Sequence, residues 1–215
     1  VGSTGDDNKY LYVCLAIAEG EINAFKKIHI MDEEQSITSF PIGSNVDVQN
    51  GSKFFVNGTA RARFQFFTGT EDQSASSLLK EHPSWTDSHR LRGVAYVACR
   101  FEWVKADFDD DGNQTLYNPW QGIPTIQVEI EGKKVLARTS YSSSDDTTTD
   151  SSTYEATTGS FAYSSIPADC LLDYLRSPRY GKGLNNNRID FTAFRSAADT
   201  CNGSKNFGGS LGTAV

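Results

Sequence analysis

The 215-residue sequence has little cysteine, one methionine and no long apolar run. The cysteines are far apart and show no C-x-x-C spacing, which argues against a zinc site and against a disulfide framework. No apolar stretch approaches the roughly 20 residues that a membrane-spanning helix needs. The sequence also lacks an H-E-x-x-H pair and a glycine loop for phosphate. We therefore expect no cofactor and no standard catalytic motif. The four cysteines are Cys14, Cys99, Cys170 and Cys201.

The charge balance is acidic, with 27 Asp and Glu against 20 Lys and Arg, a formal net charge of −7. Phosphate binding needs clustered basic side chains, so sequence-specific binding of nucleic acid is not expected. The chain begins at Val1 without an initiator methionine or a basic, apolar signal segment. We expect it to be part of a longer protein.

Apolar and alternating runs in the first two thirds of the chain predict β-strands. Residues 10–17 and 26–30 are predicted to pair as a hairpin, and residues 92–104 form a long central strand. Two Asn-Gly dipeptides divide residues 46–67 into three runs, 46–49, 52–56 and 59–67. Asn-Gly is the strongest short hairpin signal because type I′ turns need two residues at positive φ. A three-stranded meander is therefore predicted here.

The remaining third begins with a further predicted hairpin, in which residues 124–130 and 133–137 pair across Glu131-Gly132. Residues 139–160 are nearly all Ser, Thr and Asp, which predicts a flexible linker. Pro167 and Pro178 bound a predicted helix whose apolar face would comprise Leu171, Leu172, Tyr174 and Leu175. A second helix is predicted to begin at Asp190, its N-cap, and to end near Cys201.

Residues 107–118 are the best candidate for a metal site. The string D-F-D-D-D-G matches the start of a calcium loop, in which Asp107, Asp109 and Asp111 would converge on one ion. Position twelve of the loop is Asn118, where a calcium loop has a bidentate glutamate, and the flanks are predicted strand and loop. The alternative is an acidic hairpin tip that binds no ion, and the sequence favours it.

Other residues point to other functions. Glu19 and Glu21 flank a turn glycine, and paired carboxylates can hydrolyse glycosides, although solvated turn charges are far commoner. Exposed tryptophans would permit binding of a carbohydrate or a receptor by a surface β-domain; the candidates are Trp85, Trp103 and Trp120. Neither feature amounts to a catalytic site, so no enzymatic activity is predicted.

Five separated strings carry a resemblance to a known family through their order and spacing. They are residues 15–22 (where Glu21 replaces the usual proline), 66–73, 89–96, 122–135, and the helix–proline–glycine stretch 166–183 with the second helix behind it. The chain resembles the tail-tip attachment protein J family, the central tail hub of long-tailed phages. The resemblance covers almost all of the chain except the Ser/Thr-rich linker.

The resemblance implies an α+β, β-rich fold: a tube-type β-barrel hub domain (residues 1–35 and 91–138) with an inserted β-meander module (36–90). A flexible linker (139–160) and a two-helix segment (161–207) would follow. It implies a structural role in a homotrimer that contacts the distal tail protein, the tape-measure protein and other tail-tip proteins. The host receptor would be bound through other parts of the longer chain. The expected location is the tail tip of the virion, after assembly in the bacterial cytoplasm.

Overall fold

The computed structural model describes residues 2–5, 8–105, 107–136 and 161–203. The protein is an α+β protein that is rich in β-strands and has two α-helices. The chain divides into two compact units, Val1–Lys133 and Lys134–Val215. None of the helices in the described part of the chain is long and apolar enough to cross a membrane.

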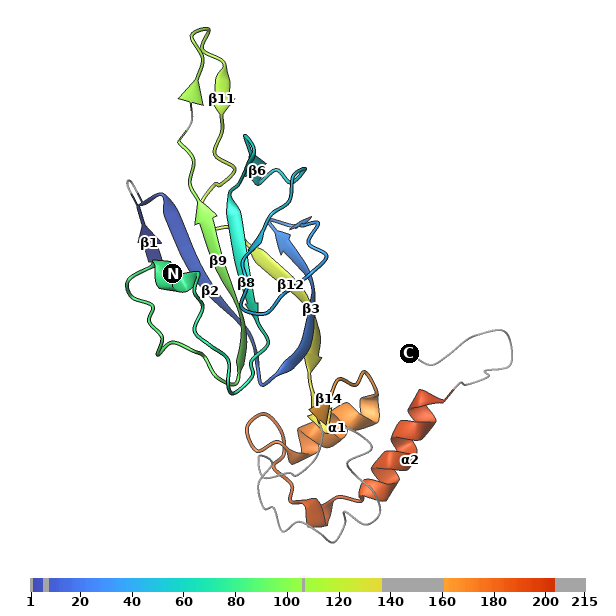
Figure 1. The fold of residues 1–215 in the computed structure, drawn as a ribbon. Coiled ribbons are helices and arrows are strands. Elements are labelled where there is room, and N and C mark those ends of the chain that lie inside the picture. The colour runs from blue at the N-terminus through green and yellow to red at the C-terminus, as the bar shows by residue number, and fades with distance from the viewer. Residues whose placement is uncertain (1, 6–7, 106, 137–160, 204–215) are drawn as a thin grey trace, which may run out of the picture. The chain divides into compact units, whose positions relative to one another are not determined.

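The first unit contains a five-stranded sheet with the order β1-β2-β9-β8-β5 and a three-stranded sheet with the order β12-β3-β4 (Figure 1). All their strand pairings are antiparallel. The five strands are β1 (Gly2–Thr4), β2 (Tyr10–Glu19), β5 (Val46–Asp47), β8 (Ala62–Phe67) and β9 (Val94–Glu102). The three strands are β3 (Ile22–Ile30), β4 (Glu33–Glu34) and β12 (Ile126–Lys133). Two short hairpins pair β6 (Phe55–Val56) with β7 (Thr59–Ala60), and β10 (Asp107–Phe108) with β11 (Gln114–Leu116).

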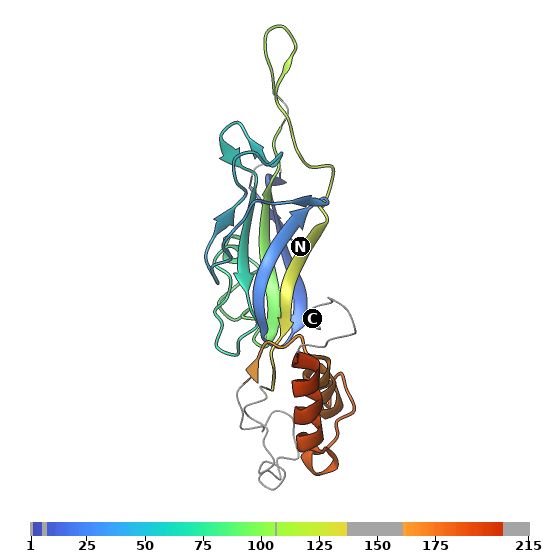
Figure 2. The ribbon, with the colours of Figure 1, turned by 90° about the vertical axis from the view of Figure 1, so that its right-hand side faces the viewer.

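The main core lies between these two sheets (Figure 2). Alternation along β8 directs Phe64 and Phe66 into this core, where they meet residues from β3 such as Phe25. The ring centroids of Phe25 and Phe66 lie 5.1 Å apart. The fully buried members from β3, β8 and β9 include Ile22, Ile28, Ile30, Phe64, Phe66, Val97 and Cys99.

The opposite face of the five-stranded sheet is covered by the long connection between β8 and β9, residues 68–93. A single 3₁₀ turn, η2 (Leu79–Glu81), lies in this connection. It contributes Leu78 and Leu79 to a second apolar cluster, in which Phe67 and Tyr96 stack with centroids 4.4 Å apart. The five-stranded sheet is therefore packed on both faces, which explains why β9 is apolar throughout its middle.

The predicted hairpin of residues 10–17 and 26–30 is wrong. β2 pairs with β1 and β9, whereas β3 pairs with β12 and β4, so the two runs lie in different sheets. Gly20, at φ +84°, turns the chain between them, and its amide donates to the Gly93 carbonyl at 2.7 Å. Placing the two apolar runs in facing sheets buries both against one core, which a hairpin within one sheet would not do.

The meander predicted for residues 46–67 is only partly correct. The hairpin at Asn57-Gly58 is confirmed, since both residues have positive φ (47° and 73°) and join β6 to β7. Val46, however, pairs with Phe64 of β8 and not with residues 52–56. Residues 51–54 form turns, and they place Phe54 in the core against Trp120, with ring centroids 4.7 Å apart. Residues 52–54 therefore form no strand, because the turn allows Phe54 to be buried.

The hairpin predicted at Glu131-Gly132 is also wrong. β12 continues through this dipeptide, because Glu131 pairs with Ala24 and Lys133 with Ile22 of the long strand β3. Pairing with an existing strand supplies backbone hydrogen bonds that a turn here would lose. The next strand, β13 (Val135–Leu136), pairs with β14 (Phe161–Ala162) in the second unit.

The described strands form open sheets and no closed barrel. Residues 36–90, predicted as an inserted module, supply β5 and β8 to the same sheet as β2 and β9. The predicted linker, residues 139–160, lies outside the described residues. The predicted helical segment, residues 161–207, contains both helices, and its last four residues are likewise outside the described part.

Both predicted helices are confirmed in the second unit, as α1 (Pro167–Arg176) and α2 (Phe191–Asn202); a 3₁₀ turn, η6 (Asn186–Arg188), precedes α2. The Asp190 side chain caps α2 by accepting a hydrogen bond from the Ala193 amide at 2.9 Å. The predicted apolar face of α1 is wrong in part. Leu172 is buried in a cluster with Ile189 and Phe191, whereas Leu171 is 50% exposed and Tyr174 is exposed as well.

The segment after α1 folds back over the end of that helix. The amides of Lys182 and Leu184 donate to the carbonyls of Tyr174 and Leu175, at 3.0 and 2.9 Å. The Tyr180 hydroxyl donates to the buried Asp173 carboxylate. These contacts occupy carbonyl groups that a helix end leaves without intrahelical partners. Residues 177–184 therefore act as an extended C-terminal cap.

Candidate functional site

The hairpin that contains β10 and β11 is an exposed part of the first unit. We call residues 103–119 the arm. It extends past the ends of β2, β8 and β9 in both ribbon views (Figures 1 and 2). Its described residues from Lys105 to Thr115 are all exposed. An isolated two-stranded hairpin is marginally stable in water, so the arm depends on how its base is held.

Trp120 anchors the base of the arm. Its indole Nε1 donates to the Glu102 carbonyl at 2.7 Å, and its ring stacks on Phe54 at an interplanar angle of 6°. Asn118 closes the base, since its Oδ1 accepts from the Val104 amide at 3.2 Å and its Nδ2 donates to the Trp120 carbonyl at 2.8 Å. The two strands of the arm therefore leave the body from a buried, hydrogen-bonded position.

The arm also contacts the β6–β7 hairpin on one side. Asn57 donates from Nδ2 to the Thr115 carbonyl, and the Tyr117 hydroxyl donates to the Lys53 carbonyl, each at 3.2 Å. Both contacts involve backbone acceptors. They orient the arm and do not involve the side chains at its tip.

The tip of the arm is a turn organised by Asp109. The Asp109 Oδ1 accepts from the amides of Asp111 and Asn113 at 3.0 and 2.8 Å, and Oδ2 accepts from the Asn113 side chain at 3.2 Å. The hydrogen bonds from Asn113 hold the pKa of this carboxyl below its usual range. Asp109 therefore acts as the structural residue of the turn.

This arrangement bears on the calcium-loop candidate. Asp107, Asp109 and Asp111 all lie in the arm. The Asp109 carboxylate, however, accepts hydrogen bonds from the backbone of its own turn, and the Asn118 side chain is bonded to Val104 at the base of the arm. No group of three or more His, Cys, Asp or Glu side chains that could hold a metal ion occurs among the residues whose positions are described. The acidic string lies at the end of the hairpin formed by β10 and β11.

Three aromatic side chains of the arm are exposed: Phe108 (58%), Trp103 (49%) and Tyr117 (47%). The sequence-based list of exposed tryptophans is wrong for Trp120, which is buried, and Trp85 is half-buried. Phe108 was missed because it lies within a run of aspartates that suggested a metal loop. Its signal was that it is the only large apolar residue between Lys105 and Gln114. Exposed aromatics beside charges are typical of protein-binding surfaces.

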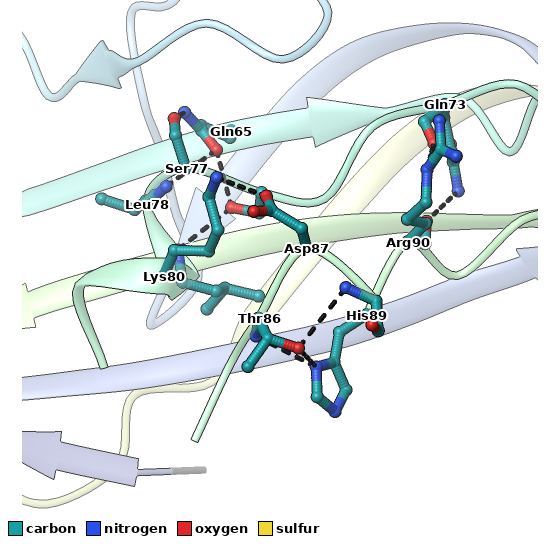
Figure 3. Close-up of polar contacts among 12 residues, drawn as sticks. Gln65, Gln73, Ser77, Leu78, Lys80, Thr86, Asp87, His89 and Arg90 are labelled. Carbon is teal, nitrogen blue, oxygen red and sulfur yellow. Dashed lines mark hydrogen bonds and ion pairs between the residues drawn. The ribbon is translucent and has the colours of Figure 1, made fainter. Parts of the chain in front are cut away.

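A second ordered surface is the connection of residues 68–93 (Figure 3). The buried Gln65 of β8 holds the inner part of it: its Oε1 accepts from the Ser76 hydroxyl and the Leu78 amide, at 2.6 and 3.2 Å, while its Nε2 donates to Ser77 at 2.7 Å. An exposed ion pair of 2.6 Å between Lys80 and Asp87 lies further along it. The connection is thereby attached to the sheet.

Gln73 joins the start of the connection to its end. Its Oε1 accepts from the Gly69 amide at 3.0 Å, and its Nε2 donates to backbone carbonyls, including that of Val94 at 3.1 Å. Arg90 in turn donates a hydrogen bond from its Nε to the Gln73 carbonyl at 2.9 Å. These groups satisfy one another, so they serve the structure of the connection.

The acidic pair considered for hydrolysis lies at the turn between the two sheets. Glu19 is the last residue of β2, and Glu21 directly precedes β3. Between them, Gly20 forms a bridge to Val94. The pair therefore occupies a connection whose backbone has a structural role.

No family model and no curated protein sequence matches the chain.

Proposed function

We propose that the protein is a structural subunit of a phage tail tip, where it forms part of the central hub that closes the tail tube. Its role is to hold neighbouring tail proteins together for host attachment and DNA delivery, without enzymatic activity. The observation that carries the proposal is the arm, a projecting hairpin with a buried base and exposed aromatic side chains. The order of the family-like strings along the chain supports the same assignment.

Phe108 is the most exposed of the three exposed aromatic side chains of the arm. A phenylalanine that is 58% exposed on a hairpin tip contributes little to the stability of its own chain. Burying it against a partner removes apolar area from water, and aromatic residues are among the side chains that dominate interface energetics. The carboxylates of Asp107, Asp110 and Asp111 around it favour a partner surface with basic side chains.

The finer architecture is part of the proposal. The assembled hub is a homotrimer in which the β-rich unit takes a tube-type arrangement, and it contacts the distal tail protein and the tape-measure protein. One chain provides open sheets, so a closed tube requires several copies. Receptor binding belongs to other parts of the longer protein.

The test is to locate the protein in particles. Antibodies against this chain, applied to purified particles of the phage that encodes it, should bind at the tail tip in electron micrographs. A Phe108→Ala phage should produce fewer complete tails, because loss of an interface aromatic weakens binding by about thirtyfold. The exposed arm variant Gln114→Ala is the matched control and should assemble normally. Label elsewhere on the particle, or normal assembly of the Phe108→Ala phage, would contradict the proposal.

The exposure of Trp103 and Tyr117 favours one alternative, a surface β-domain that binds a carbohydrate or a receptor. Aromatic faces stack on sugar rings, and Trp103 is the most exposed tryptophan of the described chain. Purified protein that binds intact host cells, and loses this binding in Trp103→Ala, would favour the alternative. The tail-tip proposal expects no cell binding by this region. A cell-wall hydrolase using Glu19 and Glu21 is a third reading, which normal infectivity of the double Gln variant would rule out.

A further inference from the structure

The chain contains three Asn-Gly dipeptides, at residues 50–51, 57–58 and 202–203. Asparagine before glycine is chemically labile, because the backbone nitrogen of the glycine can attack the side-chain amide carbon of the asparagine. Glycine has no side chain to hinder this attack. The rate of such an intramolecular reaction depends on how freely the two reacting groups can meet. The structure places the three dipeptides in different surroundings.

The first pair lies in an exposed turn between β5 and β6. The Ser52 amide donates to the Gln49 carbonyl at 3.2 Å, and Gly51 has a φ of +101°, as the third position of a type II turn requires. Among the described residues, neither the Asn50 side chain nor the Gly51 amide has a hydrogen-bond partner. A Cβ built at Gly51 would meet nothing within 4 Å. Both reacting groups are therefore free to meet.

The second pair is also exposed, but its side chain is held. The Asn57 Nδ2 donates to the Thr115 carbonyl at 3.2 Å. Asn57 itself has a positive φ, in the two-residue turn that joins β6 to β7. To react, its side chain must leave Thr115 and turn back to the Gly58 amide. We therefore expect this pair to react more slowly than the first.

The third pair lies at the end of α2, where the nitrogen that would attack is held. Asn202 is the last residue of the helix, and the Gly203 amide donates to the Asp199 carbonyl at 3.0 Å. The attacking nitrogen must lose its proton, and here that proton is engaged in a hydrogen bond. Only the first pair has both reacting groups free.

We propose that Asn50 is a site of spontaneous modification, at which the Asn50-Gly51 turn converts to aspartate and isoaspartate. First, the Gly51 nitrogen loses its proton and bonds to the side-chain carbon of Asn50, while the bond from that carbon to Nδ2 breaks and ammonia leaves. Water then opens the resulting five-membered imide at either carbonyl. One opening gives aspartate, and the other gives isoaspartate, in which the main chain runs through the side chain. This inference goes beyond the proposed function and does not depend on it.

The isoaspartate product would weaken the support of the arm. It lengthens the main chain of the turn by one carbon, so the hydrogen bond that closes the turn at Ser52 is lost. The Ser52 hydroxyl also donates to Gln35 Oε1 at 2.7 Å and accepts from the Phe54 amide at 3.2 Å. Phe54 is fully buried and stacks on Trp120 at the base of the arm. Aspartate at position 50 keeps the length of the main chain and leaves this support intact.

Ageing the purified protein at mildly alkaline pH, with digestion at intervals, tests the site. Trypsin places Asn50 and Asn57 in different peptides because Lys53 lies between them. Chromatography with mass spectrometry then separates the asparagine, aspartate and isoaspartate forms of each peptide. Asn50 should convert about tenfold faster than Asn57, since a held reacting group meets its partner less often. In denaturant the two rates should become similar, because the fold no longer distinguishes the pairs.

Two variants assign the reaction. Asn50→Gln should abolish conversion at position 50, because the longer side chain has to close a larger ring. Asn57→Gln is the matched control and should leave the rate at Asn50 unchanged. Hydrogen exchange tests the consequence: the isoaspartate form, separated by ion exchange, should exchange several-fold faster in residues 103–119 than Asn50→Asp. The Asn50→Asp variant carries the same charge in a main chain of normal length.

Other results would overturn the inference. An Asn50 that stays unmodified during ageing, or that converts no faster than Asn57 in the folded protein, would show that the free turn is not the reactive site. Equal exchange of the arm in the isoaspartate form and in Asn50→Asp would show that the turn does not support the arm through Phe54.

Discussion

Gly181 lies directly against the carbonyl oxygen of Tyr174, so closely that a Cβ built at position 181 would be 1.7 Å from that oxygen. This contact brings the segment after α1 back over the end of the helix, where Lys182 donates to the same carbonyl. The residue at 181 must therefore be glycine because of a close approach between two backbone segments.

Replacing Gly181 with alanine should displace the cap of α1. A methyl group cannot share space with a carbonyl oxygen, so the backbone must shift and the hydrogen bond from Lys182 to Tyr174 is lost. We expect a loss of about 1–3 kcal/mol in the free energy of unfolding, as for an overpacked core. Denaturant unfolding measures it. Gly203→Ala is the control, because a Cβ there would have ordinary contacts at 3.4 Å and beyond. Equal stabilities of the two variants would contradict the close contact.

The two leucines of α1 should differ sharply in their contribution to stability. Leu172 is 1% exposed within the cluster of the second unit, whereas Leu171 is half exposed. Leu172→Ala should cost about 2–5 kcal/mol and Leu171→Ala within about 0.5 kcal/mol. Thermal unfolding of the two variants measures the difference. Comparable destabilisation by both would show that the helix is rotated about its axis from the orientation described here.

The sequence allowed prediction of features that are decided locally. Pro167 and Asp190 mark helix starts, and Asn57-Gly58 marks a turn, because each acts through its own backbone or its nearest neighbours. Which strand pairs with which was not predictable in this way. Glu131-Gly132 remains extended because β3, about a hundred residues earlier, is long enough to pair with it.

In the candidate site, too, local features were predictable from the sequence and long-range contacts were not. The sequence predicted that the acidic string is either a calcium loop or a hairpin tip, and the structure shows that it lies in the β10–β11 hairpin. Burial of Trp120 was not predictable in this way, because it depends on Phe54 and Glu102, which lie elsewhere in the chain. The face of α1 was misassigned for a related reason, since its burial is decided by Ile189 and Phe191.

Gln73→Glu should loosen the connection of residues 68–93. The substitution keeps the shape of the side chain but replaces the amide donor with an oxygen that faces the carbonyls of Arg90 and Val94. We expect a loss of about 1–3 kcal/mol at neutral pH, with faster amide exchange in the connection. Hydrogen exchange followed by mass spectrometry would localise the change.

The pH dependence of this variant distinguishes repulsion from a simple loss of packing. Carbonyl oxygens disfavour the charged carboxylate, so the folded-state pKa of the new glutamate is raised above its unfolded value. The folded state then holds the proton more tightly, and stability relative to the wild type falls as pH rises through the unfolded value toward the folded value. Part of the loss should therefore be recovered in acid. A deficit independent of pH would contradict the hydrogen-bond assignment of Gln73.

Alkylation of the cysteines should follow burial and thiolate content. Burial raises the pKa of the Cys14 thiol to about 11, and full burial raises the pKa of Cys99 further, whereas Cys170 is exposed. The thiolate is the reactive form. Iodoacetamide should thus modify Cys170 faster than Cys14, with Cys99 reacting only on unfolding. Between pH 8 and pH 10 the rate at Cys14 should rise about tenfold per pH unit, since the group is still far from half ionised.

Peptide mass spectrometry after timed quenching follows Cys14, Cys99 and Cys170 separately, each in its own peptide. The Cys14→Ser variant is the control that assigns the slow phase, and it leaves Cys170 unchanged. If Cys14 reacted as fast as Cys170 at pH 8, its side chain would be solvated rather than packed against the cluster that contains Tyr12 and Ala98. If Cys99 reacted without denaturant, the sheet would open locally between β8 and β9, which its position in the main core argues against.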